Sequence, residues 1–269
     1  MEQLRKRESS RSKITLKVST ITWFVVTVLG QWAFVVYILA YYGSRTLNGD
    51  WTAWNDRPLI DGHQAGDTWG NLGFLLHTLL AAIMTAAGTV QLLPAVRARW
   101  PRLHRIGGRA FLATAAILAI SGLALVWIRG TYLNVVAAVA VSVDAILILV
   151  FSALALQTAV RHRFLEHRRW ALRTFMVANG VWMLRIGYMA WAIPTGGLGV
   201  GNSMDGPFDT FWVFGCYLLP LAILETYLWV ESNGNSAQRW GVAGLLFASA
   251  ACIALGVFGT AMFRWLPYL

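Results

Sequence analysis

Two histidines open long apolar segments, and each is surrounded by arginines. His104 lies in RARWPRLHRIGGR, residues 97–109, and His167 lies in RHRFLEHRRWALR, residues 161–173. Imidazole is a ligand for haem iron and other transition metals, and the forked guanidinium group pairs with carboxylates and phosphates. The two stretches therefore predict a site where imidazoles and guanidinium groups act together on one ligand.

The surroundings of the two histidines fit such a site. Gly107 and Gly108 follow His104 by about one turn, so a flat ligand or a second helix can approach the helix closely there. The arginines that could bind acidic substituents of a ligand are Arg105, Arg109, Arg168 and Arg173. Two other readings stay open. Arginines at these positions follow from membrane topology alone, and a basic pocket also suits a phospholipid headgroup.

A second set of ionisable residues lies inside apolar segments, where charge is costly and points to a function. At 1.5 Å per residue, His77, Asp144 and Arg185 each lie roughly 9–13 Å from the outer ends of their segments. We expect an ion pair between Asp144 and Arg185, with His77 beside it to give or take a proton. Such a cluster suits a quinone headgroup or proton transfer, and the alternative is a purely structural salt bridge.

Membrane-spanning helices must position these residues. Of the 269 residues, 57% are hydrophobic and 13% are charged, whereas soluble proteins have about 25% charged residues. Seven segments are long enough to cross the hydrocarbon core as helices, because lipid offers no partner for unpaired backbone groups. They are residues 18–42, 71–94, 110–128, 135–160, 174–192, 211–230 and 240–263. The predicted fold is an all-α bundle of seven transmembrane helices, forming one domain over residues 1–269.

The charge distribution predicts how the bundle faces. Seventeen Lys and Arg residues lie on one side, in residues 1–17, 97–109 and 161–173 and at Arg239, and four lie on the other, including Arg57. Because positively charged loops stay inside, we expect a cytoplasmic N-terminus and an outer C-terminus, in the cell inner (plasma) membrane. The net charge of +10 then reflects topology and contact with anionic lipids, not nucleic-acid binding.

The positions of the histidines indicate which helices form the core. The first, sixth and seventh predicted helices contain none, so the second to fifth are expected to form a four-helix core and the others to be peripheral. Residues 1–17 form a basic cytoplasmic tail. Residues 43–70 are polar and rich in tryptophan, and we expect an ordered outer loop or short helix with its tryptophans at headgroup level.

Residues 70–190 carry a set of motifs with a specific spacing. They are His77, Gly88, Gln91, Pro94, Arg97, LHRIGGR at 103–109, HRRWALR at 167–173 and Arg185. In these motifs the chain resembles an uncharacterised multi-pass membrane family that is known only as a domain of unknown function. This resemblance implies a membrane fold and no particular activity.

A looser likeness is more informative about chemistry. The four-helix core with histidines at helix ends is similar to the transmembrane ascorbate-reducible cytochrome b family, whose core helices each supply one histidine to hold two haems b. The resemblance implies that His104 and His167 are the axial metal ligands of one inner haem b. His77 lies where an outer ligand would lie, but the helix at 135–160 has no histidine, so a second haem is not implied.

We therefore expect a membrane haem b protein, a transmembrane oxidoreductase that carries electrons across or within the membrane. Quinone or proton transfer would occur at His77, Asp144 and Arg185, and a redox partner or the subunits of a membrane complex would exchange electrons with it. The alternative is a non-redox membrane subunit or a lipid- or quinone-binding protein without haem. A proton-coupled transporter is less favoured, because the sequence shows no inverted repeat with broken helices.

Overall fold

The computed structural model describes residues 2–56 and 61–269, with side chains from Glu8 onward. Within these ranges the regular structure is entirely helical. The helices are α1 (Glu2–Ile38), α2 (Ser44–Leu47), α3 (Thr68–Gln91), α4 (Pro94–Arg99), α5 (Pro101–Trp127), α6 (Val135–Val160), α7 (Phe164–Ala178), α8 (Gly180–Thr195), α9 (Pro207–Asn233) and α10 (Ser236–Thr260). Short π or 3₁₀ turns extend α1 and α10 and form residues Thr52–Asp56 of the outer loop.

Polar residues between the apolar segments set where the helices begin. Asp67 caps α3 by accepting from the backbone N–H of Gly70, and Asn134 caps α6 by accepting from that of Ala137. Asn235 caps α10 together with Gln238 in a reciprocal capping box. The caps satisfy backbone donors that the first turn leaves free, so the boundaries follow from local chemistry.

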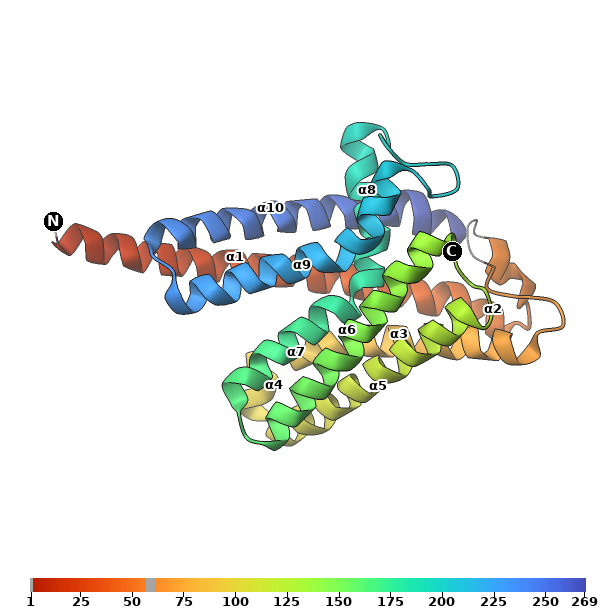
Figure 1. Cartoon of the computed structure of the whole chain (residues 1–269), viewed down its shortest axis with the longest axis horizontal. Helices are drawn as coiled ribbons and strands as arrows, with labels where there is room; N and C mark the ends of the chain where they lie inside the picture. Colours follow the sequence, from red (N-terminus) through yellow and green to blue (C-terminus); the bar gives the residue numbers. More distant parts are fainter. Residues whose placement is uncertain (1, 57–60) are drawn as a thin grey trace.

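Within the described residues, six helical segments are long and apolar enough to cross a membrane, and an all-α membrane bundle is thus confirmed. They are Glu8–Leu47, Thr68–Gln91, Pro101–Trp127, Val135–Val160, Pro207–Asn233 and Ser236–Tyr268. The predicted seventh span at 174–192 is not confirmed as one continuous helix. The chain is broken there into α7 and α8, which meet at Asn179, and α8 crosses α10 (Figure 1).

The break has a local cause. Asn179 is followed by Gly180, and both residue types are poor helix formers because asparagine competes for backbone hydrogen bonds and glycine loses much backbone entropy. Asn179 adopts φ −99° and ψ 8°, outside the α-helical region, and its side-chain N–H donates to the carbonyl of Phe175 at 2.7 Å. The helix therefore ends at Ala178 and restarts in a new direction.

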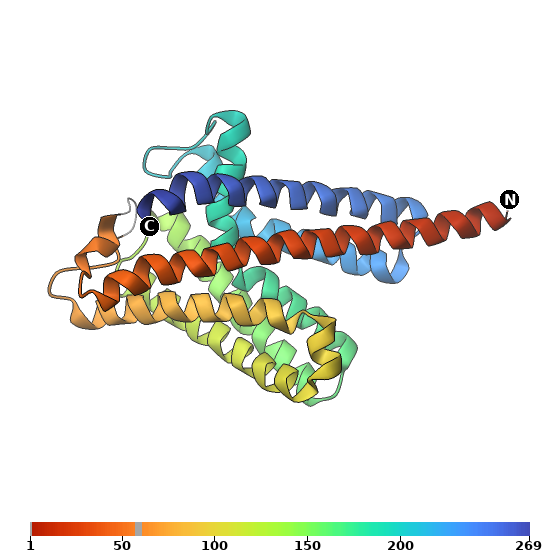
Figure 2. The same ribbon diagram turned by 180° about the vertical axis from the view of Figure 1, so that it is seen from behind.

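The helices form two groups whose inner ends diverge (Figures 1 and 2). In one group α3, α5, α6 and α7 pack in succession, as predicted for the four-helix core. In the other, α1 packs along α10, and α9 contacts α10, α7 and α6. This second group was predicted to be peripheral, which is wrong, because residues of α1, α9 and α10 make up much of the buried hydrophobic core.

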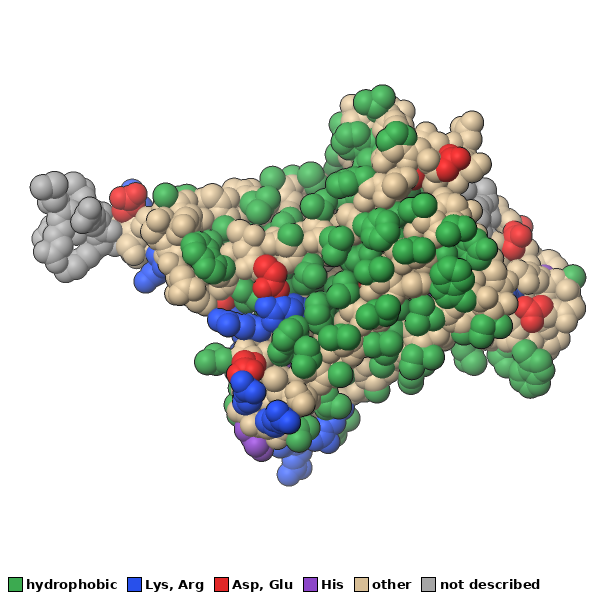
Figure 3. All heavy atoms as spheres, in the orientation of Figure 1, with side chains coloured by type: hydrophobic (Ala, Val, Ile, Leu, Met, Phe, Trp, Pro, Cys, Tyr) green, Lys and Arg blue, Asp and Glu red, His purple; other side chains and the backbone are tan. Residues whose placement is uncertain are grey.

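The charged ends of the molecule agree with the predicted pattern. Figure 3 shows Lys and Arg side chains gathered at the end where the N-terminus and the turn between α6 and α7 lie, with wide hydrophobic surface beyond them. The C-terminus lies at the opposite end, near the outer loop (Figure 1). The assignment of these ends to cytoplasm and exterior stays a prediction. Arg57, which was counted with the outer charges, lies outside the described residues.

The outer loop packs against α3, and its aromatic residues differ in exposure. Trp54 is 1% exposed and packs on the rings of Trp51, Tyr42 and Phe74. Trp69, in contrast, is 82% exposed. Trp54 thus anchors the loop to α3 through Phe74, and the position of the loop's tryptophans at headgroup level stays a prediction.

Candidate functional site

The structure brings the two predicted imidazoles together at the inner end of the four-helix core. His104 is the fourth residue of α5 and His167 is the fourth residue of α7. Both side chains are half-buried, and they are close enough to interact electrostatically with each other. Two helices that are not adjacent in the chain therefore place their histidines at one level.

A backbone contact holds the ring of His167. Its Nδ1 lies 2.9 Å from the carbonyl oxygen of Ala155 on α6. A carbonyl only accepts hydrogen bonds, so Nδ1 carries a proton, and in the neutral ring Nε2 keeps its lone pair. Histidines that ligate a metal through Nε2 usually have their other ring nitrogen held in this way. The hydrogen bond thus fixes the orientation of the His167 ring.

His104 and a neighbouring glutamine have buried polar atoms that lack partners. Among the described residues, neither Nδ1 of His104 nor Oε1 of Gln91 has a hydrogen-bond partner, and both atoms are buried. The Gln91 amide lies against Gly107, in the space where a side chain would begin, and it also approaches Gly108. The two glycines therefore make room for a polar group from α3 in this structure, at the position proposed for a flat ligand.

Two of the four arginines predicted to bind acidic substituents have glutamate partners instead. The Arg168 guanidinium donates to both carboxylate oxygens of Glu231, at 2.7 and 3.0 Å. Arg173 does the same with Glu225, at 2.6 and 2.7 Å. These forked ion pairs join α7 to α9, and sequence reasoning missed them because glutamates about 50 to 60 positions away carry no local signal. A role for Arg168 and Arg173 in binding a ligand is therefore not supported by their contacts.

The other two predicted arginines remain available. Arg105 and Arg109 are exposed, and they lie on α5 one residue and five residues after His104. Arg97, which lies on α4 between α3 and α5, also interacts electrostatically with His104. Positive charge near the histidine pair thus comes mainly from α4 and α5.

A haem between His104 and His167 would be compatible with the contacts of His167, and it would reach the glycine surface only after a rearrangement. The hydrogen-bonded Nδ1 of His167 suits an imidazole ligand, whereas Nδ1 of His104 has no partner among the described residues and so lacks the bond that usually orients a ligating histidine. Arg105 and Arg109 could pair with two propionates. Gln91 would have to leave the face of Gly107. The described part of the chain has no group of three or more His, Cys, Asp or Glu side chains that could hold a metal.

The predicted outer cluster is divided in the structure. Nδ1 of His77 lies 2.8 Å from the Ser121 hydroxyl on α5, and His77 also interacts electrostatically with Arg185. Arg185 donates to the Val181 carbonyl of its own helix and lies 5.5 Å from the Phe34 ring. His77 and Arg185 thus lie in one region, on α3 and α8.

Asp144 does not form the predicted ion pair. Its carboxylate is directed to the start of α8, at Gly180, and no described residue makes a salt bridge with it. The reason is the break at Asn179, which turns α8 away from α6 and carries Arg185 towards α1. A depth count along straight helices could not include this turn.

The sequence did not predict a network of hydrogen bonds around Arg129 at the outer surface. The Arg129 guanidinium donates to Asp67 at 3.0 Å, to the Gly62 carbonyl at 3.0 Å and to the Asn71 side chain at 2.6 Å. Two hydrogen bonds lower the pKa of the Asp67 carboxyl: the larger effect comes from the backbone N–H of Gly70 and the smaller from the Arg129 side chain. These contacts fasten the outer loop to the end of α5.

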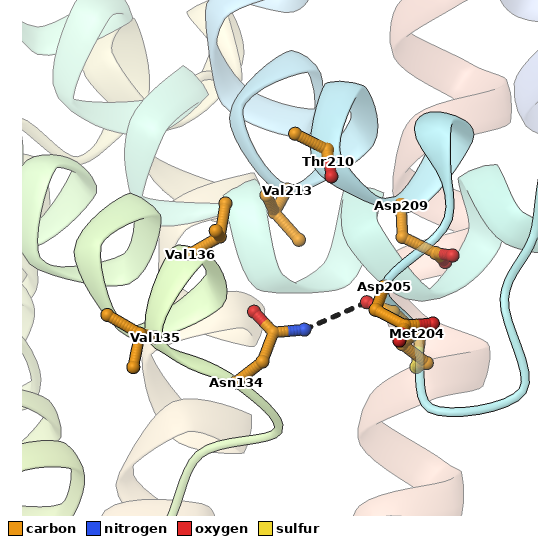
Figure 4. Close-up of a pocket in the computed structure, with 8 residues that line it drawn as sticks. All are labelled: Asn134, Val135, Val136, Met204, Asp205, Asp209, Thr210 and Val213. Carbon is orange, nitrogen blue, oxygen red and sulfur yellow. Dashed lines mark hydrogen bonds between the residues drawn. The ribbon is translucent and has the colours of Figure 1, made fainter.

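A small outer cavity of about 160 Å³ is lined mainly by apolar atoms. Figure 4 shows Asn134 donating to the Met204 carbonyl across its rim, while the Asp209 carboxylate points away from the valines that line the other side. Asp209 instead accepts from the backbone N–H groups of Gly201 and Gly206, at 2.7 and 2.9 Å. Its contacts order the loop before α9.

Comparison with known proteins gives a family without an assigned activity. Neither the curated proteins nor the solved structures that were searched contain a match. One family matches residues 74–223, a range that includes His77, His104, Asp144, His167 and Arg185. Because this range is more than half of the chain, the protein belongs to the family DUF2306, described as a predicted membrane protein.

Proposed function

We propose that this membrane protein binds one haem b at its inner end, between His104 and His167, and carries electrons within the membrane. The observation that supports the proposal most is the hydrogen bond from Nδ1 of His167 to the Ala155 carbonyl, because it leaves Nε2 free for a metal. A haem held by two imidazoles supplies one-electron transfer.

The residues of the chain have separate roles in this proposal. His167 is oriented by its hydrogen bond to the Ala155 carbonyl, while His104 has a buried nitrogen with no partner in the described residues. Arg105 and Arg109 neutralise acidic substituents at the aqueous edge. The forked ion pairs of Arg168 and Arg173 hold α7 against α9 and so fix the position of His167.

The outer region is a second and separate site. Ser121, which contacts His77, lies 17 residues beyond His104 on α5, or about 25 Å along the helix. His77 and Arg185 could donate hydrogen bonds to the carbonyl oxygens of a quinone. We therefore assign quinone or proton exchange to His77 and Arg185, without Asp144.

The test is a reduced-minus-oxidised absorption spectrum of the purified full chain supplied with haem. We expect sharp low-spin b-type bands in the wild type, and their loss in His104→Ala and in His167→Ala, because each variant lacks one axial ligand. His162→Ala is the matched control, since this exposed histidine lies in the same inner turn and should be without effect. A wild-type protein without bands, or histidine variants that keep them, would reject the proposal.

A second candidate function is binding of an anionic lipid at the same end. It is favoured by a surface hollow of about 560 Å³ lined by Arg99, Trp100, Pro101, Arg102 and Leu103. Guanidinium groups suit a phosphate, and an indole ring suits the headgroup region. Arg99→Ala with Arg102→Ala should then weaken retention of phosphatidylglycerol in native mass spectra without changing the haem spectrum, and unchanged retention would reject lipid binding there.

A further inference from the structure

The helix break at Asn179 lies next to the carboxyl group of Asp144. A Cβ atom at Gly180 would lie only 2.8 Å from Oδ2 of Asp144, so the carboxyl group packs directly on the first residue of α8. Gly180 is what allows this approach, because it has no side chain. The contact joins α6 to the point where the chain changes direction.

Asp144 is buried, and no described residue forms a salt bridge with it. The residue is 6% exposed, and its Oδ1 atom is buried and has no hydrogen-bond partner among the described residues. The titratable side chains that interact with it electrostatically are Cys216 and Tyr217 of α9, and neither can carry positive charge. An ionised carboxylate with such surroundings would be very unstable in an apolar interior.

A second oxygen at the break also lacks a partner. Asn179 is 4% exposed, and its side-chain N–H donates to the Phe175 carbonyl, which fixes the amide group. The amide oxygen Oδ1 is buried and unpartnered within the described part of the chain. The carboxylate of Asp144 and the amide oxygen of Asn179 both carry negative charge or partial negative charge, so a cation would stabilise both.

The depth of the break suits an ion site. Asp144 is nine residues beyond the first residue of α6, or about 13 Å from its outer end, which is close to the middle of a hydrocarbon core about 30 Å thick. Irregular backbone at such a depth is tolerated where it lines a polar site, and broken helices in membrane transporters supply oxygen ligands to Na⁺ or H⁺.

We propose that Asp144, with the amide oxygen of Asn179, forms an intramembrane binding site for a single monovalent cation at the break between α7 and α8. Its occupant is a proton or Na⁺, which share the chemistry of one positive charge on a carboxylate. A bound cation would link α6 to α8, because Asp144 belongs to α6 and its carboxyl group packs on Gly180 at the start of α8. This site is independent of the proposed haem at the other end of the core.

The test is thermal unfolding of the full chain in lipid nanodiscs, with Na⁺ replaced by choline at constant ionic strength, from about pH 5 to about pH 9, the range in which buried carboxyl groups titrate. If Na⁺ binds, the melting temperature of the wild type rises with Na⁺ and saturates, and Asp144→Asn loses the rise. If the proton binds, Na⁺ has no effect, and the wild type gains stability on acidification relative to Asp144→Asn.

Further variants separate the two sources and control for folding. Asn179→Ala should raise the half-saturating Na⁺ concentration about tenfold if that oxygen is a ligand, since one such contact is worth about 1.4 kcal/mol. Asp144→Glu should keep the cation or pH response, and Asp205→Asn, a change in an exposed outer loop, should leave it as in the wild type. If Asp144→Asn shifts the melting temperature equally at every Na⁺ concentration and pH, or not at all, the site does not exist.

Discussion

Removing the charge of Glu225 should destabilise the protein by leaving Arg173 without its partner. In the structure the two side chains make two short hydrogen bonds, and Arg173 is 18% exposed whereas Glu225 is 45% exposed. A fully buried pair loses about 3–5 kcal/mol when one partner is removed, and a fully exposed pair is worth at most about 1 kcal/mol. The exposures place this pair between these limits, so we expect Glu225→Gln to cost about 2 kcal/mol.

The assay is thermal unfolding in detergent, followed by tryptophan fluorescence. A loss of that size corresponds to a fall in melting temperature of about 4–8 °C for a chain of this size. The double variant Glu225→Leu with Arg173→Met should recover most of it, because no charge is stranded. Glu166→Gln is the control, since its pair with Arg163 is exposed on both sides. If Glu225→Gln behaves like Glu166→Gln, then Arg173 has another anionic partner, and the pairing described here is not what holds α7 to α9.

Three further predictions concern the fold. Asp67→Ala should lower the stability at neutral pH and make stability depend less on pH in acid. The folded-state pKa of Asp67 is lowered, so the carboxylate stabilises the fold above the ordinary carboxyl pKa of about 4, and this contribution disappears as the pH falls through the folded-state pKa. A series of melting curves at different pH values would detect the difference. Gly88→Val should prevent stable assembly of the core, because even a Cβ atom would lie 2.8 Å from the Phe111 ring; size-exclusion chromatography should show aggregation, and a normal monomer peak would count against the packing. Trp54→Ala should cost about 3–5 kcal/mol and make the outer loop sensitive to protease, whereas Trp69→Ala should do neither.

The sequence predicts much of this fold because membrane-spanning helices can be recognised from long runs of apolar residues. The segment predicted at 135–160 matches α6 at both ends, because Asn134 is a cap and the residues between are almost all apolar. The inner histidine pair was also predictable, since His104 and His167 each follow a short basic turn that must lie at one end of the bundle. Length, hydrophobicity and charge are sufficient for conclusions of this kind.

The contacts within the candidate sites depend on the directions that the helices take, and a periodic sequence pattern does not contain these directions. The Asn-Gly dipeptide at 179 and 180 was visible, but in an apolar run it did not tell whether the helix would bend or stop. Once α8 turned, Asp144 and Arg185 separated, although their depths in straight helices agree. Partners such as Glu225 for Arg173 lie far away in the sequence, and only the packing of α9 on α7 brings them together.

The haem content of the purified chain tests the central proposal most directly. Protein expressed with an ample haem supply should contain one haem b per chain, measured as iron and as pyridine haemochrome, and the double variant His104→Ala with His167→Ala should contain none. The His77→Ala variant should still contain one, because His77 contacts Ser121 at the other end of the core. No haem in the wild type, or one haem that depends on His77 and survives loss of the inner pair, would contradict the account.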